Sequence, residues 1–261
     1  MKISYAITVC NEHNEIEKLL TFLFEHKREE DQVVVQMDMN ATKEVIDVCE
    51  RFESHQASEY NLTQFALNKN FAAYKNNLNK QCDGNWIFQI DADEIPNEYL
   101  IEALPFILEA NEETEAFWVP RVNTVAGITD EHVAKWGWKL NEDKWVNFPD
   151  WQMRIYRNKE EIYWIKPVHE QLKGYTKFAN LPAEEKYALY HPKDIGRQER
   201  QNAFVSSFAS KIKGKASIKY SFGISSASIW NIQLPSHCLF KLFLYAAKFL
   251  FSSNCNNLYS S

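Results

Sequence analysis

Apolar residues follow two alternating patterns along the first 110 positions. Continuous apolar runs of strand length are typical of buried strands, and apolar positions that recur every three or four residues are typical of helices with one buried face. The predicted strands are 3–10, 32–37 and 86–90, and the predicted helices are 16–24, 45–52, 71–82 and 99–108, the last with Pro96 in its first turn. Strands that alternate with helices build a mostly parallel sheet covered on both faces, so the sequence predicts an α/β fold.

The pattern changes after residue 110. Further strands are predicted at 116–122, 152–156 and 163–165. Between the first two lies a stretch rich in aromatic residues, with tryptophans at positions 136, 138, 145 and 151. We therefore divide the chain into a domain of residues 1–200, with halves 1–110 and 111–200, and a helical tail of residues 201–261.

The composition excludes several classes of protein. The 261 residues are 45% hydrophobic, and the spacing of the seven glycines fits neither a G-x-G-x-x-G dinucleotide loop nor a P-loop. Five cysteines without a C-x-x-C pair argue against a disulfide framework and a cysteine-rich zinc site. The N-terminus turns polar after ten residues and lacks the apolar core of a signal peptide, so we expect a reduced, cytoplasmic protein.

Charge is distributed unevenly along the chain. The net charge of −6 combines −13 from residues 1–199 (22 basic, 35 acidic) with +7 from residues 200–261 (7 basic, none acidic). An acidic body lacks the positive face that nucleic-acid binding requires, so no nucleic-acid partner is expected.

The apolar segment 238–251 lies in the acid-free tail. It is shorter than the ~20 residues of a transmembrane helix. Its Lys241 and Lys248 are seven positions apart and share one face of a helix. This pattern predicts peripheral contact with the cytoplasmic face of a membrane. A helix that docks on the rest of the chain or on another subunit is the alternative.

Two aspartates follow the apolar run 86–90, as Asp91-Ala92-Asp93-Glu94. In an open parallel sheet, ligands bind beyond the carboxyl ends of the strands. If the strand geometry continues, Asp91 and Asp93 point the same way. Such a pair suits a hard divalent cation, Mn²⁺ or Mg²⁺, that also binds phosphate oxygens. A solvated acidic turn that caps the next helix is the alternative.

Six sequence blocks occur together in the first 200 residues. They are TVCNEHNE (8–15), VVVQMD (33–38), NFAAYKN (70–76), WIFQIDADEIP (86–96), WQMRIYRN (151–158) and PVHE (167–170). In this order they resemble family-2 glycosyltransferases of GT-A fold, and among them the bacterial sugar transferases of the lipopolysaccharide core. The sequence departs from the common family pattern after the second strand, where DMNAT (38–42) replaces a D-x-(S/G)-T-D-like turn.

The resemblance implies an inverting, metal-dependent enzyme of glycan biosynthesis. It would move a sugar from a nucleoside-diphosphate sugar, in our expectation a UDP-sugar, to a hydroxyl of a glycan or lipid-linked acceptor. The first half of the domain would bind the donor and the second half the acceptor. The implied donor-binding residues are Val9, Asn11, Glu12, Asp38, Lys75, Asn76, Asp91 and Ala92. The implied metal ligands are Asp91, Asp93 and His169, with His191 as a further candidate. The general base is Glu170 as first choice and Asp150 as second.

The aromatic stretch suits an acceptor site, because an aromatic face stacks on the C–H groups of a sugar ring. The candidates are Trp136, Trp138, Trp145 and Trp151. Packing of a small lid or core is the alternative for each of them. Helix capping is the alternative for Asn11 and Asp38, and a solvated surface charge is the alternative for Lys75.

Two other functions stay open. A catalytically inactive relative would bind a sugar or a nucleotide without transferring it, although Asp91, Asp93 and Glu170 argue against that function. A nucleotidyltransferase would also use acidic residues, but the sequence lacks the glycine-rich, basic loop expected near its N-terminus.

Overall fold

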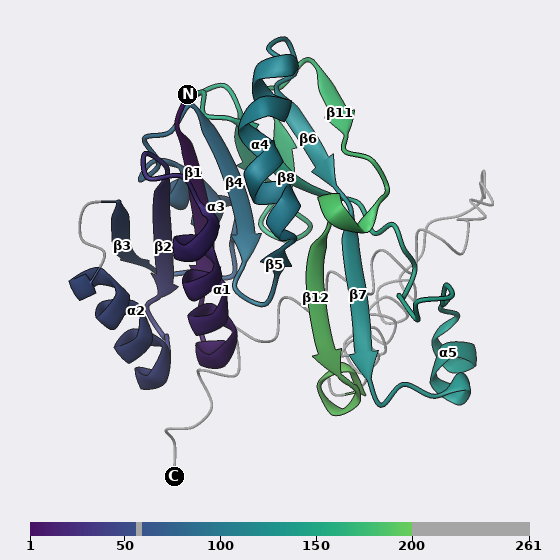
Figure 1. Ribbon diagram of the computed structural model, residues 1–261. Coiled ribbons are helices and arrows are strands. Elements are labelled where there is room, and N and C mark those ends of the chain that lie inside the picture. Colours follow the sequence, from purple (N-terminus) through teal and green to yellow (C-terminus); the bar gives the residue numbers. More distant parts are fainter. Residues whose placement is uncertain (56–58, 200–261) are drawn as a thin grey trace, which may run out of the picture.

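One large sheet forms the centre of the protein. The computed structural model describes residues 1–55 and 59–199. The strands of this sheet are β1 (Ile3–Val9), β2 (Gln32–Asp38), β3 (Tyr60–Phe65), β4 (Trp86–Asp91), β6 (Ala116–Val119), β8 (Gln152–Arg157) and β11 (Phe178–Asn180). They lie in the order β11-β6-β8-β4-β1-β2-β3 (Figure 1). Strands β1 to β4 are parallel, and only β8 runs antiparallel to its neighbours β4 and β6. The predicted α/β fold with a mostly parallel sheet is confirmed.

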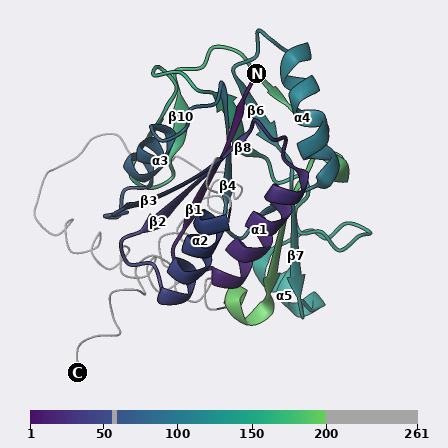
Figure 2. The ribbon, with the colours of Figure 1, turned by 60° about the vertical axis from the view of Figure 1, so that its left-hand side comes forward.

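Helices cover both faces of this sheet. They are α1 (His13–His26), α2 (Lys43–His55), α3 (Phe71–Asn79) and α4 (Glu98–Ala110). The short α5 (Asp130–Trp136) packs in a small separate core near the end of the strand Arg121–Ala126, and a 3-10 turn lies at Glu185–Tyr187. Apolar side chains of α1, α2 and α4 share one core with the strands. Those of α3 share a second core on the opposite face with the hairpin of β9 (Tyr163–Ile165) and β10 (Gln171–Lys173). Figure 2 shows α3 and β10 on one side of the sheet and α1, α2 and α4 on the other.

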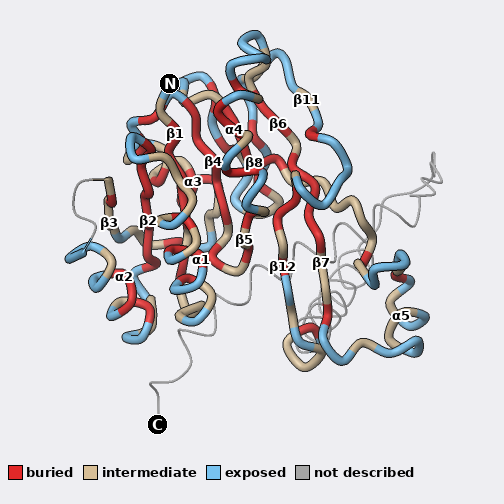
Figure 3. Tube along the Cα trace, viewed as in Figure 1, coloured by how far each residue is buried: buried red, intermediate tan, exposed pale blue. Residues whose placement is uncertain are grey.

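The central strands are buried on both faces, as parallel strands between two helix layers must be. Strands β1, β2 and β4 are buried along nearly their whole length (Figure 3). Tyr5, Trp86 and Phe88 are completely buried in the core under α1 and α4. The rings of Tyr5 and Phe88 lie 5.9 Å apart. This packing holds the carboxyl ends of the strands at one fixed edge.

The strand predicted over 116–122 is in fact two strands. Pro120 separates β6 from β7 (Arg121–Ala126), because proline has no N–H to continue the ladder. Strand β7 leaves the large sheet and pairs in parallel with β12 (Leu189–Asp194), which also pairs with β5 (Ile95–Pro96). This three-stranded sheet projects past the carboxyl end of β4 (Figure 1). The break at Pro120 therefore builds the wall opposite the acidic turn.

Three further expectations need correction. Pro96 does not lie in the first turn of a helix: it pairs with Leu189 in a strand, and α4 begins after Asn97, whose side chain accepts a hydrogen bond from the Tyr99 N–H. The helix predicted over 71–82 ends at Asn79. Strand β3 was not predicted, because as an edge strand it carries the mixed sequence YNLTQF instead of an apolar run.

The helix predicted at 238–251 and the whole tail lie outside the described residues. Among the helices of residues 1–55 and 59–199, none is long and apolar enough to cross a bilayer.

Candidate functional site

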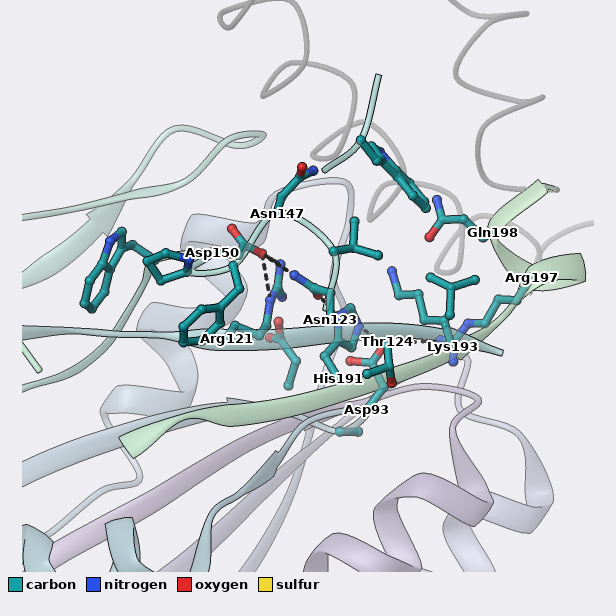
Figure 4. A pocket seen from close by; sticks show the side chains of 18 of the residues that line it. Asp93, Arg121, Asn123, Thr124, Asn147, Asp150, His191, Lys193, Arg197 and Gln198 are labelled. Atoms are coloured by element: carbon teal, nitrogen blue, oxygen red, sulfur yellow. Dashed lines mark hydrogen bonds and ion pairs between the residues drawn. The ribbon is translucent and has the colours of Figure 1, made fainter. Parts of the chain in front are cut away.

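A cavity of about 1220 Å³ opens at the carboxyl ends of β1, β2 and β4. Val9, Asp38 and Asp91, the last residues of these strands, line its floor. The opposite wall comes from β7, β12 and the loop 136–151 (Figure 4). Both halves of the chain therefore contribute to one site, and it lies where an open parallel sheet binds ligands.

The two aspartates of the acidic turn at the end of β4 contact different partners. The Glu94 N–H donates to the Asp91 carbonyl at 2.9 Å, so the chain turns sharply instead of continuing as a strand. Asp91 accepts a hydrogen bond from Arg154 Nη2 at 2.5 Å. Asp93 Oδ2 lies 3.1 Å from His191 Nε2. The strand geometry, which was the condition for Asp91 and Asp93 to point the same way, therefore ends at Asp91.

A buried carboxylate joins two arginines behind the turn. Glu94 is completely buried and accepts from Arg121 Nη1 at 2.8 Å and from Arg154 Nη2 at 2.6 Å. Its other oxygen accepts from the Asp91 N–H at 3.2 Å. Buried charges require such pairing, because an isolated ion loses its hydration without compensation.

The same arginine, Arg121, holds Asp150 at the cavity wall. Asp150 Oδ2 accepts from Arg121 Nε at 3.0 Å, from Arg121 Nη2 at 2.6 Å and from Asn123 Nδ2 at 3.0 Å. Asp150 Oδ1 accepts from Gln152 Nε2 at 2.9 Å. Burial acts to raise the pKa of Asp150, but the Arg121 charge and these hydrogen bonds outweigh it and hold that pKa below its usual value. Asp150 is therefore an ionised carboxylate, and three donors occupy one of its oxygens.

His191 connects the acidic turn to β7. Its Nδ1 lies 2.8 Å from Asn123 Oδ1, and its Nε2 faces Asp93. Burial and the charges of Lys193 and Arg121 lower the pKa of His191 to about 4, against the opposing effect of Asp93. Both ring nitrogens face an oxygen atom, Asn123 Oδ1 on one side and Asp93 Oδ2 on the other.

Two basic side chains line the cavity beside Asp93. Lys193 comes from β12, and Arg197 from the helical turn that follows at 195–199. Arg197 Nη2 lies 3.3 Å from Asp93 Oδ2, and Arg197 Nη1 lies 3.5 Å from Glu15 Oε1. Positive charge therefore gathers at the end of the cavity next to the acidic turn (Figure 4).

The predicted metal ligands Asp91, Asp93 and His169 are not brought together. In the described ranges, no three His, Cys, Asp or Glu side chains converge as a metal-binding group. Asp91 pairs with Arg154, and His169 is not among the residues that line the cavity. The Asp93 carboxylate and the His191 Nε2 lone pair do fit a divalent cation, since a carboxylate oxygen and a neutral imidazole nitrogen are both established ligand types.

Of the eight residues expected to bind the donor, five line the cavity: Val9, Glu12, Asp38, Asp91 and Ala92. Asn11, Lys75 and Asn76 do not. Glu12 Oε2 accepts from the Cys10 and Asn11 N–H groups, both at 3.0 Å, and burial raises its pKa. Asp38 is buried, and its oxygens accept from backbone N–H groups of the two following loops, at residues 40 and 67. Much of the hydrogen-bonding capacity of Asp38 therefore stabilises these loops.

Lys75 and Glu170 form an ion pair outside the cavity lining. Lys75 Nζ lies 2.8 Å from Glu170 Oε1, and both side chains are about 95% buried. The ammonium group also sits 4.4 Å from the centre of the Trp164 ring. Next to it, the Asn76 side chain exchanges two hydrogen bonds of 2.8 Å with the Trp164 backbone. These contacts attach α3 to the β9–β10 hairpin.

The four candidate tryptophans have different surroundings. Trp136 and Trp138 line the cavity and also pack with Val125 and Val146 in a small third core. Trp151 lines the cavity as well. Trp145 does not, and its ring contacts Phe148 at 4.8 Å. Trp136 and Trp138 therefore pack in a small core and line the cavity at the same time.

A family model described as "Glycosyl transferase family 2" matches residues 4–170. The chain belongs to glycosyl transferase family 2. The match spans all six blocks on which the resemblance rests. No curated protein sequence matches this family-2 chain.

Solved structures share its fold at low sequence identity. The Staphylococcus aureus TarS fragment 1–349 in complex with UDP-GlcNAc is 16% identical, with a TM-score of 0.54 over 74% of this chain and 59% of that one. Full TarS is covered over only 37% of its length. The Pyrobaculum calidifontis mannosyltransferase PcManGT in complex with GDP-Man and Mn²⁺ is 13% identical, with a TM-score of 0.51 over 95% of this chain and 69% of that one.

Sequence reasoning missed the polar residues that organise this family-2 site. Arg121 lies near the end of the predicted strand 116–122, Asn123 directly after it, and Arg154 within the predicted strand 152–156. None of the three had an assigned role. Their alternate positions on a β-strand indicated only which face they share. Their partners lie 27 to 68 residues away in sequence, so no local pattern could have found the pairs.

Proposed function

We propose that this chain is an inverting glycosyltransferase that uses a nucleoside-diphosphate sugar and Asp150 as general base. One observation carries the proposal: Asp150 lines the same cavity as Asp93, His191, Lys193 and the strand ends that hold nucleotides in open α/β sheets. An acceptor hydroxyl and a donor sugar would meet between these two walls.

The reaction needs a base on one side and charge stabilisation on the other. The acceptor hydroxyl loses its proton to Asp150 as its oxygen attacks the anomeric carbon, and the bond from that carbon to the diphosphate breaks with its electron pair. Asp150 Oδ1 is the atom for the proton, because Oδ2 already accepts three hydrogen bonds. The positive charges of Lys193 and Arg197 would stabilise the negative charge that develops on the departing diphosphate.

Asp150 suits the role of base better than Glu170. Glu170 is buried against Lys75 and does not line the cavity, whereas a base must lie within hydrogen-bond reach of the proton that it removes. The first choice made from the resemblance is therefore replaced by the second in this proposal.

Metal dependence is part of the same proposal. Asp93 and His191 would hold Mn²⁺ or Mg²⁺, and such an ion, when bound, supplies Lewis-acid stabilisation of the leaving diphosphate. Asp91 would contribute through Arg154 instead of as a direct ligand. The relative PcManGT binds Mn²⁺ together with GDP-Man, which supports a divalent cation here.

Donor and acceptor are assigned by class only. A UDP-sugar is our first expectation, supported by the UDP-GlcNAc complex of TarS, and the GDP-Man complex of PcManGT makes a GDP-sugar the alternative. Trp136, Trp138 and Trp151 line the cavity, and their rings would stack on the sugar rings of an acceptor glycan. A lipid-linked acceptor, including one of the lipopolysaccharide core, stays a prediction of the sequence resemblance.

Hydrolysis of UDP-, GDP- and dTDP-sugars, with and without Mn²⁺, tests the proposal, with water in the place of the acceptor. Asp150→Asn should lower the rate by roughly 10²–10⁴-fold with donor affinity nearly unchanged, and Asp93→Ala should remove the Mn²⁺-dependent part. Glu170→Gln is the matched control and should retain the rate per folded molecule. If Glu170→Gln is slow and Asp150→Asn is active, Glu170 is the base. Binding without any turnover would favour the inactive sugar-binding relative.

A further inference from the structure

Asn123 lies between the two functional walls of the cavity. It is the third residue of β7 and pairs in register with His191 of the neighbouring strand β12, so the two side chains share one face of the small sheet. Its Nδ2 lies 3.0 Å from Asp150 Oδ2, and its Oδ1 lies 2.8 Å from His191 Nδ1. Figure 4 shows the amide between these two side chains.

The chemistry of the partners fixes the orientation of this amide. Asp150 is ionised beside Arg121 and only accepts hydrogen bonds, so the nitrogen of the amide must face it. The oxygen of the amide then faces His191 Nδ1, which must carry the proton. The other ring nitrogen, Nε2, then faces Asp93 Oδ2 3.1 Å away.

His191 Nε2 and Asp93 Oδ2 are 3.1 Å apart, the distance of an N–H···O hydrogen bond. A divalent cation bound by both atoms would take the place of the Nε2 proton, because a metal-binding imidazole nitrogen must be deprotonated. Arg197 Nη2 lies 3.3 Å from the same Asp93 oxygen. The arrangement is the one in which a metal-binding histidine donates its other N–H to a protein acceptor, which sets its tautomer.

We propose that Asn123 is a positioning residue that couples the two walls: one amide sets the Nδ1–H tautomer of His191 for a cation shared with Asp93 and, through its other end, holds the Asp150 carboxylate. The inference rests on the proposed function for the roles of His191 and Asp150. It adds that a single side chain aligns the donor side with the acceptor side.

Two substitutions separate the two ends of the amide. Asn123→Asp keeps an oxygen to accept the His191 Nδ1–H but places a second carboxylate against Asp150. It should leave the Kd for Mn²⁺ within about threefold and lower kcat by about 10–100-fold, because the base is displaced. Asn123→Ala removes both contacts, so it should weaken Mn²⁺ binding by about 10–100-fold, the usual effect of losing a partner of a ligating histidine, and lower kcat as well.

Three measurements on the full chain provide the readouts. Mn²⁺ binding is followed by electron paramagnetic resonance without donor, kcat and KM by nucleotide-sugar hydrolysis, and the His191 tautomer by ¹⁵N NMR. The wild-type protein should show His191 protonated on Nδ1, and Asn123→Ala should lose this preference. Asn14→Asp, exposed on α1, is the control for the added charge and should match the wild-type protein.

The outcomes are distinct. An Nδ1 of His191 without a proton in the wild-type protein overturns the inference, even if Asn123→Ala fails to fold. Equal loss of Mn²⁺ affinity in Asn123→Asp and Asn123→Ala also overturns it, as does a change in Tm with kcat and Mn²⁺ affinity intact. If the wild-type protein hydrolyses no nucleotide sugar, the proposed function fails, while the tautomer and Mn²⁺ binding still decide whether Asn123 positions His191.

Discussion

At the scale of the residue, the Glu94 carboxylate neutralises two buried arginines. Both Arg121 and Arg154 donate to the same oxygen, and Glu94 is completely buried. Glu94→Gln would leave both guanidinium groups with less opposing charge while both side chains stay largely buried. Breaking a buried pair in this way costs about 3–5 kcal/mol. We expect the free energy of unfolding in urea to fall by about that amount.

The control for this substitution is Glu102→Gln. Glu102 lies on the exposed side of α4, and its removal should change the free energy of unfolding by less than about 0.5 kcal/mol. A stability of Glu94→Gln equal to that of the control would show that other groups neutralise Arg121 and Arg154.

Residues at the site were predictable by type but not by partner. The sequence placed acidic residues after β4 because an apolar run ends there, and the cavity does lie at that edge. It gave no indication that Arg154, 63 residues away, would pair with Asp91, or that Lys75 would pair with Glu170, 95 residues away. Such partners depend on which strands become neighbours, which is a property of the whole sheet.

At the scale of the element, the Lys75–Glu170 pair attaches α3 to the segment after β9. Phe71, the first residue of α3, also donates its N–H to the Pro167 carbonyl at 2.9 Å. Glu170→Gln leaves the buried Lys75 ammonium with a weaker partner, so the free energy of unfolding should fall by about 3 kcal/mol. Chemical denaturation measures this change.

Glu160, which is exposed, supplies the comparison, and Glu160→Gln should have little effect on stability. The rate of nucleotide-sugar hydrolysis per folded molecule should stay near that of the wild-type protein in both variants. A fall of 10²-fold or more in Glu170→Gln, with stability intact, would contradict a structural role and return Glu170 to the position of base.

Elements with strong apolar periodicity were predictable, and elements set by tertiary pairing were not. The apolar runs identified β1, β2 and β4, since strands between two helix layers must be apolar on both faces. Strand β12, with the sequence LYHPKD, has no such pattern, and its pairing with β7 defines it. The cavity wall opposite the acidic turn was therefore the part of the fold that the sequence did not predict.

At the scale of the whole molecule, the two halves of the chain form one sheet and one cavity. Strand β8 from the second half inserts between β4 and β6, and the loop 136–151 faces the carboxyl ends of the first strands. The alternation of strands and helices predicted the first half of this arrangement. Nothing comparable predicts where the tail of residues 200–261 acts, although its charge suggests a measurement.

The tail carries +7 without a single acidic residue, whereas the described body is acidic. If segment 238–251 lies on an anionic membrane, Lys241 and Lys248 each contribute about 1 kcal/mol near the surface in addition to apolar burial. Reversing both charges, as Lys241→Glu with Lys248→Glu, should therefore weaken binding to phosphatidylserine vesicles by roughly 30-fold or more. Sedimentation of the full chain with vesicles at two salt concentrations measures the effect.

The matched control reverses two exposed lysines of the body, Lys18 and Lys80, and changes the net charge by the same amount. It should bind vesicles like the wild-type protein, because the effect belongs to the tail and not to total charge. A protein that ends at Lys213 should lose vesicle binding and keep metal-dependent hydrolysis of the nucleotide sugar. If that shortened protein aggregates or unfolds, segment 238–251 docks on the body or on another subunit. Vesicle binding that survives both changes would exclude the tail as a membrane contact.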